Sequence, residues 1–360
     1  MNLYGNIRQG LKKQYSSEPK GNVARHLNTL TSFVYGILKS RHVTLSEVAS
    51  EIPNAGKEES KVKQLKRWIS NERIEFKVYF LPFIQALLQS LAHQTLLLVI
   101  DGSVVGRGCV TLMVSLVYKN RTLPLIWVTR KGKKGHFPEN IHVELIEAVH
   151  DLIPEGTDVV VLGDGEFDGT NWLSTIKSFD WNYVCRTAKD SVFYEEGEHF
   201  NIQDICPKRG GCTAISDLEF TKKRYSTATA IAWWGKKYKE PIYLVTSFDT
   251  AGEACHYYRK RFRIETLFSD HKSRGFNLHK SHLTDPERIS RLMIATSLAY
   301  IWLVYLGEYA MQTAWNKIIH RTERCDLSLF KLGGRLLKRF LREGISIPCF
   351  NFLLLDNALL

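Results

Sequence analysis

The sequence lacks the patterns that mark secreted, zinc-binding and membrane-spanning proteins. Its seven cysteines are odd in number and include no Cys-x-x-Cys pair. This argues against a disulfide framework or a zinc ribbon and favours a reducing cytoplasm. The first residues contain no apolar signal-peptide core, so we expect no secretory leader. The longest apolar run, 292–307, is shorter than the roughly 20 residues that a membrane span requires, and we expect a buried core helix there.

Positive charge is in excess. The chain has 49 Lys and Arg residues against 37 Asp and Glu residues, which gives a formal net charge of +12. A basic protein of this size attracts polyanions, of which nucleic acid is the commonest. A merely basic soluble protein remains the alternative on charge alone. Hydrophobic residues make up 44% of the 360 residues, enough to build a buried core.

The first 90 residues have helical patterning. Apolar residues recur at helical spacing over 27–38. Thr44, followed three residues later by Glu47, forms a capping-box pattern that predicts the start of a short helix. A second, basic helix follows over 57–70. A short helix, a turn and a basic helix are typical of a DNA-binding helix-turn-helix, while a helical bundle with one solvated basic face fits equally well.

From residue 95 the pattern changes to strands. Two continuous apolar runs, 96–100 and 159–163, each lead into an aspartate, Asp101 and Asp164. They predict buried strands that deliver a polar group at their ends. With the elements between and after them, the order is β-β-β-α-β-α-β, which resembles the RNase H-like fold, where catalytic acids lie on the first and fourth strands. The other elements are expected at 110–117, 123–129, 139–152, 172–178 and 181–185.

Asp101 and Asp164 are the residue type that metal-dependent phosphoryl transfer requires. This chemistry uses two divalent ions about 3.5–4 Å apart, bridged by carboxylates. Mg²⁺ prefers oxygen ligands, so its sites contain Asp and Glu rather than Cys or His. Each aspartate alone is better explained as a turn residue that caps the next element. The two together, in this strand order, favour a metal site.

A third carboxylate lies in a segment with helical spacing. Tyr258, Arg261, Glu265 and Lys272 stand at offsets of 0, 3, 7 and 14. In a continuous helix over about 254–273 they would fall within about 60° of arc. One face would then present a hydroxyl, a guanidinium, a carboxylate and an ammonium group. A solvated charged stripe on an amphipathic helix is the alternative.

The spacing Tyr-x2-Arg-x3-Glu-x6-Lys resembles the signature of the DDE cut-and-paste transposases of bacterial insertion sequences. All four motif residues match. Together with the two aspartates, the resemblance covers about 95–290. It implies an RNase H-like catalytic core in an α/β protein. It also implies a β-rich insertion before the last catalytic helix and an N-terminal helical DNA-binding domain.

The resemblance implies which residues would perform the reaction. Asp101, Asp164 and Glu265 would form the catalytic triad and bind two Mg²⁺ ions, with Mn²⁺ as an expected substitute. This one site would nick the transposon end, release the flanking DNA and transfer the strand. The expected partners are the terminal inverted repeats, the target DNA and a second copy of the chain in a homodimer, with no membrane and no small-molecule substrate. The residues implied to bind DNA are Tyr258, Arg261 and Lys272.

The gap between the last two triad residues predicts the insertion. From Asp164 to Glu265 there are 101 positions, 265 minus 164, far more than a loop in a compact domain. Relatives that release flanking DNA through a hairpin carry a β insertion that holds a flipped base. They often have Trp at the start of its last strand, where Ile242 stands here. The candidate substitutes are Tyr243, Trp233 and Trp234.

These patterns predict a layout of four regions. The N-terminal DNA-binding domain is expected at 1–90, the catalytic core at 91–190 and 249–300, the insertion at 191–248 and a helical C-terminal region at 301–360. A basic loop over 130–136 is expected on the DNA-facing side. The apolar end, 353–360, is expected to be a packed helix or part of an oligomer contact.

Two other functions stay open at this point. An RNase H-like nuclease could use the same triad without strand transfer. A DNA-binding protein derived from a transposase could keep the N-terminal region and lose catalysis, although the presence of all three carboxylates disfavours it. We expect a cytoplasmic bacterial protein associated with the nucleoid.

Overall fold

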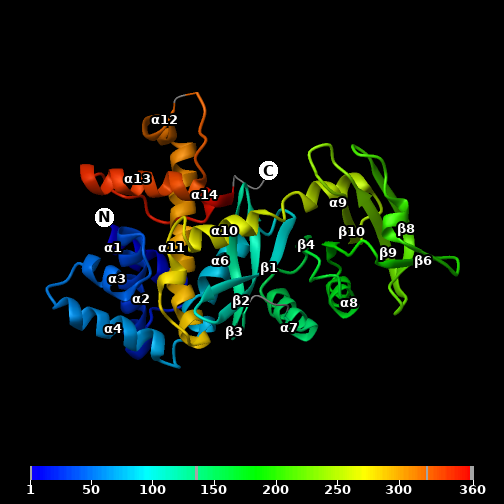
Figure 1. Ribbon diagram of the computed structural model, residues 1–360. Helices are drawn as coiled ribbons and strands as arrows, with labels where there is room; N and C mark the ends of the chain where they lie inside the picture. The colour runs from blue at the N-terminus through cyan, green and yellow to red at the C-terminus, as the bar shows by residue number, and fades with distance from the viewer. Residues whose placement is uncertain (1, 134–136, 322, 357–360) are drawn as a thin grey trace.

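The structure, a computed structural model, describes residues 2–133, 137–321 and 323–356. N-terminal helices lie on one side of the molecule, a β-sheet with packed helices lies in the centre, and further strands lie on the opposite side (Figure 1). Two predicted features fall partly outside the described residues. These are 134–136 of the basic loop and 357–360 of the apolar end.

Six helices precede the sheet, as the helical patterning predicts. Thr44 stands at the N-cap of α3, but its side chain makes no capping hydrogen bond, so the predicted capping box with Glu47 is not formed. The basic helix α4 is fixed on α2 because the Trp68 indole donates to the backbone oxygen of His26 at 3.1 Å. The helices are α1 (Leu3–Lys12), α2 (Gly21–Ser40), α3 (Leu45–Glu51), α4 (Glu58–Ser70), α5 (Phe76–Tyr79) and α6 (Leu81–Leu91).

The central strands follow the predicted order. The first three form an antiparallel meander, and the next two add in parallel, which gives the spatial order β3-β2-β1-β4-β5. This mixed α/β arrangement is consistent with an RNase H-like core. The elements are β1 (Leu96–Gly106), β2 (Cys109–Tyr118), β3 (Arg121–Lys131), α7 (Glu139–His150), β4 (Val159–Gly163), α8 (Thr170–Ser178) and β5 (Asn182–Arg186).

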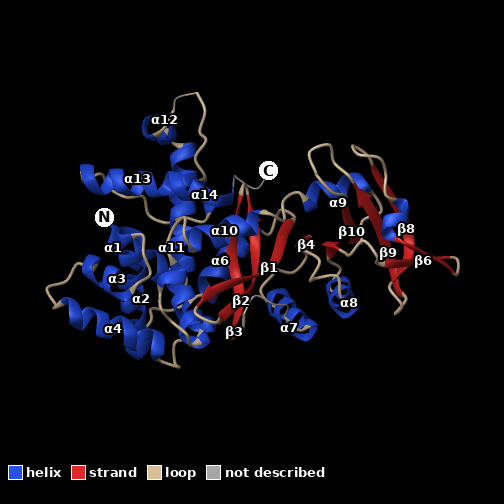
Figure 2. Ribbon diagram, viewed as in Figure 1, coloured by secondary structure: helices blue, strands red, loops and turns tan. Residues whose placement is uncertain are grey.

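The strands expected in the insertion continue the same sheet. β10 pairs antiparallel with β5, and the sheet then runs on through β9, β8, β6 and β7 to ten strands (Figure 2, red). Strand β10 is therefore the direct neighbour of β5, and β5 separates it from β4. The added elements are β6 (Val192–Glu195), β7 (Glu198–Asn201), η1 (Ile202–Ile205), β8 (Cys212–Phe220), β9 (Tyr225–Trp233) and β10 (Ile242–Thr246).

A long apolar helix, α11 (Pro286–Gln312), runs through the helical half of the molecule. Its length and composition would suffice to cross a membrane, but 89% of its most apolar window is buried inside the protein. It packs against α2, α4, β3 and α13. The expected core helix at 292–307 is confirmed, and it runs without a break through the predicted boundary at residue 300. The last helices are α12 (Trp315–Ile319), α13 (Leu329–Glu343) and α14 (Leu353–Asp356).

The turn after α10 (Arg263–His271) depends on Gly275. A Cβ at this position would lie 1.9 Å from the carbonyl oxygen of Asp270 and 2.8 Å from the ring of Phe330. The same oxygen accepts a hydrogen bond from the Phe276 amide at 2.9 Å, so it cannot move away freely. We predict that Gly275→Ala lowers the free energy of unfolding by about 1–3 kcal/mol, measured by chemical denaturation.

Gly252 provides the matched control. It lies in the first turn of α9 (Ala251–Tyr258), and a Cβ there would meet no atom within 4 Å. Gly252→Ala should therefore leave stability unchanged or raise it slightly, since alanine favours a helix over glycine. Equal stabilities for the two variants would contradict the close approach at Gly275.

Candidate active site

Two neighbouring parallel strands bring Asp101 and Asp164 together. β1 and β4 pair with an offset of 63 positions, as in Leu96 with Val159. Asp164 follows Asp101 by the same 63 positions, 164 minus 101, so the register places them side by side. The sequence analysis predicted Asp101 at the end of its strand, and this is wrong, because Asp101 lies in the middle of β1. The strand continues because it stays paired with β2, where Met113 lies opposite Asp101.

The prediction of one continuous helix over 254–273 is wrong. The segment forms α9 (Ala251–Tyr258) and α10, which are joined by a turn at 259–262. The four motif residues therefore do not share one helix face. Tyr258 is the last residue of α9, and Arg261 lies in the turn. Glu265 lies on α10, and Lys272 is the C-cap of that helix. Because Arg261 lies in this turn and not on a helix, its side chain extends towards Asp101 and Asp164.

Arg261 occupies the centre of this site. Its guanidinium lies 3.7 Å from a carboxylate oxygen of Asp101 and 3.8 Å from one of Asp164. It donates a hydrogen bond to Glu265 at 2.8 Å. The arginine is only 6% exposed. Three carboxylates from three elements thus share one buried cation, which offsets their mutual repulsion.

Burial and negative neighbours perturb Asp101. Burial contributes most and the charge of Asp164 contributes next, and together with a smaller effect of Glu265 they raise the pKa of Asp101 to about 6. Arg261 and the amide of Gly102 act in the opposite direction. The raised pKa therefore reflects mainly the loss of solvent around the carboxyl group, and next the negative charge of Asp164.

The donor set fits a hard divalent cation. Carboxylate oxygens are the ligands that Mg²⁺ prefers, and a positive group already lies between them. As arranged, the described residues contain no group of three His, Cys, Asp or Glu side chains around a point that could hold a metal. The three carboxylates converge on the guanidinium instead. A metal bound by these three carboxylates would therefore require the Arg261 side chain to move aside and the carboxylates to close around the ion.

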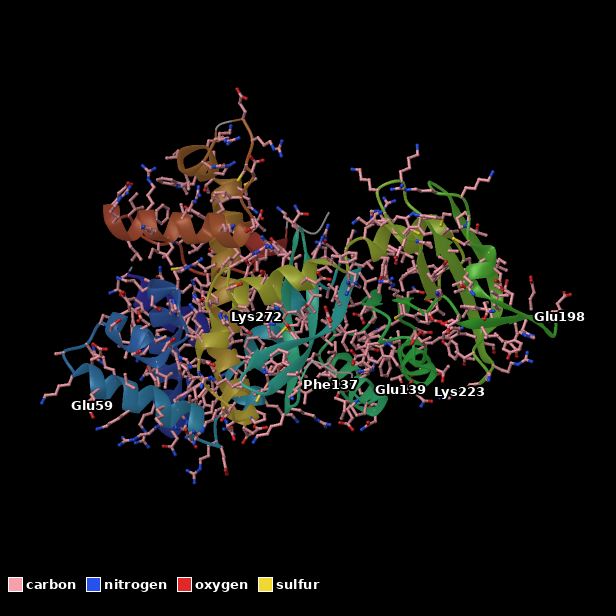
Figure 3. The ribbon with its side chains drawn as sticks, viewed as in Figure 1. Glu59, Phe137, Glu139, Glu198, Lys223 and Lys272 are labelled. Atoms are coloured by element: carbon pink, nitrogen blue, oxygen red, sulfur yellow. The ribbon has the colours of Figure 1, made fainter. Side chains whose placement is uncertain are left out.

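Two cavities meet at Asp164. The larger, about 790 Å³, is lined by the three carboxylates and by Ser103, Phe137 and Lys272 among others. In Figure 3, Lys272 and Phe137 both lie in the central part of the molecule. The smaller cavity, about 550 Å³, lies beside Arg261. Its other lining residues include Arg186, Lys189 and Tyr243.

The remaining two motif residues have contrasting environments. Tyr258 is 1% exposed and packs edge-on against Phe262. Its burial raises the pKa of its hydroxyl to about 12. Contact between its ring and DNA would require a rearrangement. Lys272 instead lines the larger cavity and donates to Ser103 at 2.6 Å, so it already stands where a phosphate could enter.

The sequence analysis missed Glu166, a fourth carboxylate in the larger cavity. It accepts a hydrogen bond from the Phe137 amide at 2.6 Å and lies 3.4 Å from a ring nitrogen of His142. These contacts hold the segment that follows β3 against the site. Its position two residues after Asp164 was the only signal in the sequence.

Comparison with known proteins assigns the family. The Transposase DDE domain matches residues 94–302, which is more than half of the chain, and the chain belongs to this family. It is therefore a transposase-family enzyme that acts on DNA. No curated protein matches the chain. Among solved structures, it is similar to the piggyBac transposase in a cryo-EM synaptic complex with hairpin DNA. The identity is 12% and the TM-score 0.48, over 99% of this chain and 81% of that chain.

Arg261→Gln should destabilise the metal-free protein, because it leaves three carboxylates without their shared cation. We expect a loss of about 1–3 kcal/mol, less than for a fully buried pair, since Asp164 and Glu265 are 36% and 54% exposed. Mg²⁺ should restore the lost stability, so it should raise the melting temperature more in the variant than in the wild type. Lys189→Gln, at an exposed cation of the smaller cavity, is the control. A wild-type response of Arg261→Gln would count against this role.

The raised pKa of Asp101 predicts a pH-dependent metal affinity. Above a pKa of about 6 the carboxylate is ionised and can bind a metal, and below it a proton competes. Lowering the pH from about 7.5 to about 5.5 should therefore weaken Mg²⁺ binding about fourfold for one competing proton. Isothermal titration calorimetry measures this directly. An aspartate with an ordinary pKa would stay ionised over this range and leave the affinity unchanged.

Proposed function

We propose that this chain is a cut-and-paste transposase that cleaves DNA at transposon ends and transfers the freed strand into target DNA. Asp101, Asp164 and Glu265 are its catalytic residues in this proposal. The observation that supports it most is their convergence, from strand β1, the residue just after β4 and helix α10, on one cationic position beside two cavities. The family of the chain supports the same reaction class.

The carboxylates of this triad would hold two Mg²⁺ ions, or Mn²⁺ as a substitute, which when bound supply an activated water or 3′-hydroxyl and stabilise the leaving oxygen. The basic side chains bind and position the DNA. Lys272 lies in the larger cavity, and Arg186 and Lys189 lie in the smaller one, on either side of Asp164. Arg261, once released, would bind a phosphate through its planar fork of donors.

The hairpin route is part of this proposal, with Tyr243 as the residue that stacks on a flipped base. Tyr243 lies on β10, lines the smaller cavity and is partly exposed. Ile242, where relatives often have Trp, is buried, and so is Trp233. Neither offers an open face to a base without a rearrangement.

The N-terminal helices are proposed to bind the terminal inverted repeats. Lys66 and Arg67 are exposed on α4, while Trp68 on the other side of this helix is buried. Basic side chains on one helix face can follow a DNA backbone or enter a groove. We further propose that two copies of the chain pair two transposon ends, and that the element is a bacterial insertion sequence whose enzyme acts at the nucleoid.

Glu265→Gln tests the proposal. The change removes one metal-binding charge but keeps the shape of the side chain. We predict that cleavage of a labelled DNA carrying the end of the element falls at least about 10³-fold in Mg²⁺. DNA binding and the melting temperature should change little, because Glu265 is half exposed. Glu253→Gln, at an exposed glutamate on α9, is the matched control and should cleave like the wild type.

The products separate the competing functions. Cleavage at the boundary followed by joining to a second DNA supports a transposase, and a hairpin product supports the role of the insertion. Cleavage without joining indicates a nuclease that shares the triad. DNA binding without cleavage by the wild type indicates a DNA-binding protein that has lost catalysis. Equal cleavage by wild type and Glu265→Gln would show that the triad is misassigned.

A further inference from the structure

Two cysteines that are 43 positions apart in the sequence lie in contact in the structure. The sulfur atoms of Cys212 and Cys255 are 3.9 Å apart, and both are free thiols. Cys212 is exposed at the start of β8, whereas Cys255 is buried on α9. All seven cysteines lie within the described residues, and in that part of the chain Cys212 and Cys255 are the pair whose sulfur atoms are in contact.

The surroundings hold the two thiols together. Cys212 pairs in the sheet with Trp233. The guanidinium of Arg259, at the C-cap of α9, lies 4.9 Å from the centre of the Trp233 ring. The end of α9 is thus fixed to β8 and β9 by both contacts. The hydrogen bond with Cys255 lowers the pKa of the Cys212 thiol, which favours a thiolate at the exposed sulfur.

We propose that Cys212 and Cys255 form a redox-active dithiol that hydroperoxides convert to a disulfide. The exposed Cys212 thiolate attacks one oxygen of the peroxide, the O–O bond breaks, and the departing hydroxide takes up a proton as water. The Cys255 sulfur then attacks the sulfenic acid on Cys212. The S–O bond breaks and a second water leaves with the Cys255 proton. Two thiols lose two electrons, and one hydrogen peroxide becomes two waters.

Formation of the disulfide brings the two sulfur atoms closer together. A disulfide bond is about 2.05 Å long, so the sulfurs must approach by about 1.9 Å. The bond would join the outer strands covalently to α9. Cys255 is six positions before Arg261, 261 minus 255, and α9 leads directly into the turn that carries this arginine.

The disulfide would therefore restrain the part of the chain that must move when a metal enters. A covalently fixed α9 limits how far the turn at 259–262 can carry the guanidinium away from the carboxylates. Oxidation should then weaken metal binding and slow catalysis. This consequence rests on the proposed function, while the formation of the disulfide does not.

The chemical step is tested by mass spectrometry on the native full chain. One equivalent of hydrogen peroxide, followed by alkylation under denaturing conditions, should protect two thiols and yield a linked peptide pair containing Cys212 and Cys255. Dithiothreitol should reverse the change. Cys212→Ser should yield no such pair, whereas Cys349→Ser, at an exposed cysteine elsewhere, should behave like the wild type. The proposal is overturned if other cysteines are oxidised first, or if the sulfenic acid of Cys212 forms but never reacts with Cys255 to give a disulfide.

The consequence is tested by calorimetry of Mg²⁺ binding, separately from DNA cleavage. We expect the oxidised wild type to bind Mg²⁺ about fivefold or more weakly than the reduced form. Peroxide-treated Cys212→Ser should keep the affinity of the reduced protein. Equal affinities of the two wild-type forms overturn the regulatory role. Normal Mg²⁺ binding by a reduced protein that cleaves no DNA contradicts the proposed function and leaves the redox effect measurable.

Discussion

The site depends on the ion pairs between three carboxylates and one guanidinium group. Asp101, Asp164 and Glu265 would repel one another at this spacing, and Arg261 supplies the charge that lets them converge. This arrangement needs two parallel strands in matched register and a helix that begins just after a turn. The metal-free site is thus arranged around one positive group, and in the proposed function a divalent cation would take the place of the guanidinium among the same carboxylates.

Much of this fold could be predicted because its signals are local. Long apolar runs mark buried strands, and the residue that follows such a run is held rigidly. The order of strands and helices from 96 to 186 is therefore visible in the sequence. The pairing of Asp101 with Asp164 could be inferred from the strand order, and the structure adds that their spacing of 63 equals the register offset of β1 and β4.

The rest depends on contacts between distant residues. The stretch 254–273 contains no proline or glycine, the usual signals of a helix break. The break leaves Arg261 in a turn from which it reaches Asp101 on β1 and Asp164 just after β4. Neither the hydrophobic pattern nor helix propensity predicts such ion pairs. The pairing of β10 with β5 and the contact of Cys212 with Cys255 are likewise set by tertiary packing. The motif gave the residue types of the site but not that Tyr258 would be buried.

The most direct test of the account is a crystal structure of the protein with Mn²⁺, located by anomalous scattering. The account predicts manganese at about 2.1 Å from carboxylate oxygens of Asp101, Asp164 and Glu265, with the Arg261 guanidinium displaced from them. Manganese bound elsewhere would contradict it. So would an unaltered cluster of Arg261 and the three carboxylates at saturating Mn²⁺, because the site would then be a structural ion-pair network and not a metal centre.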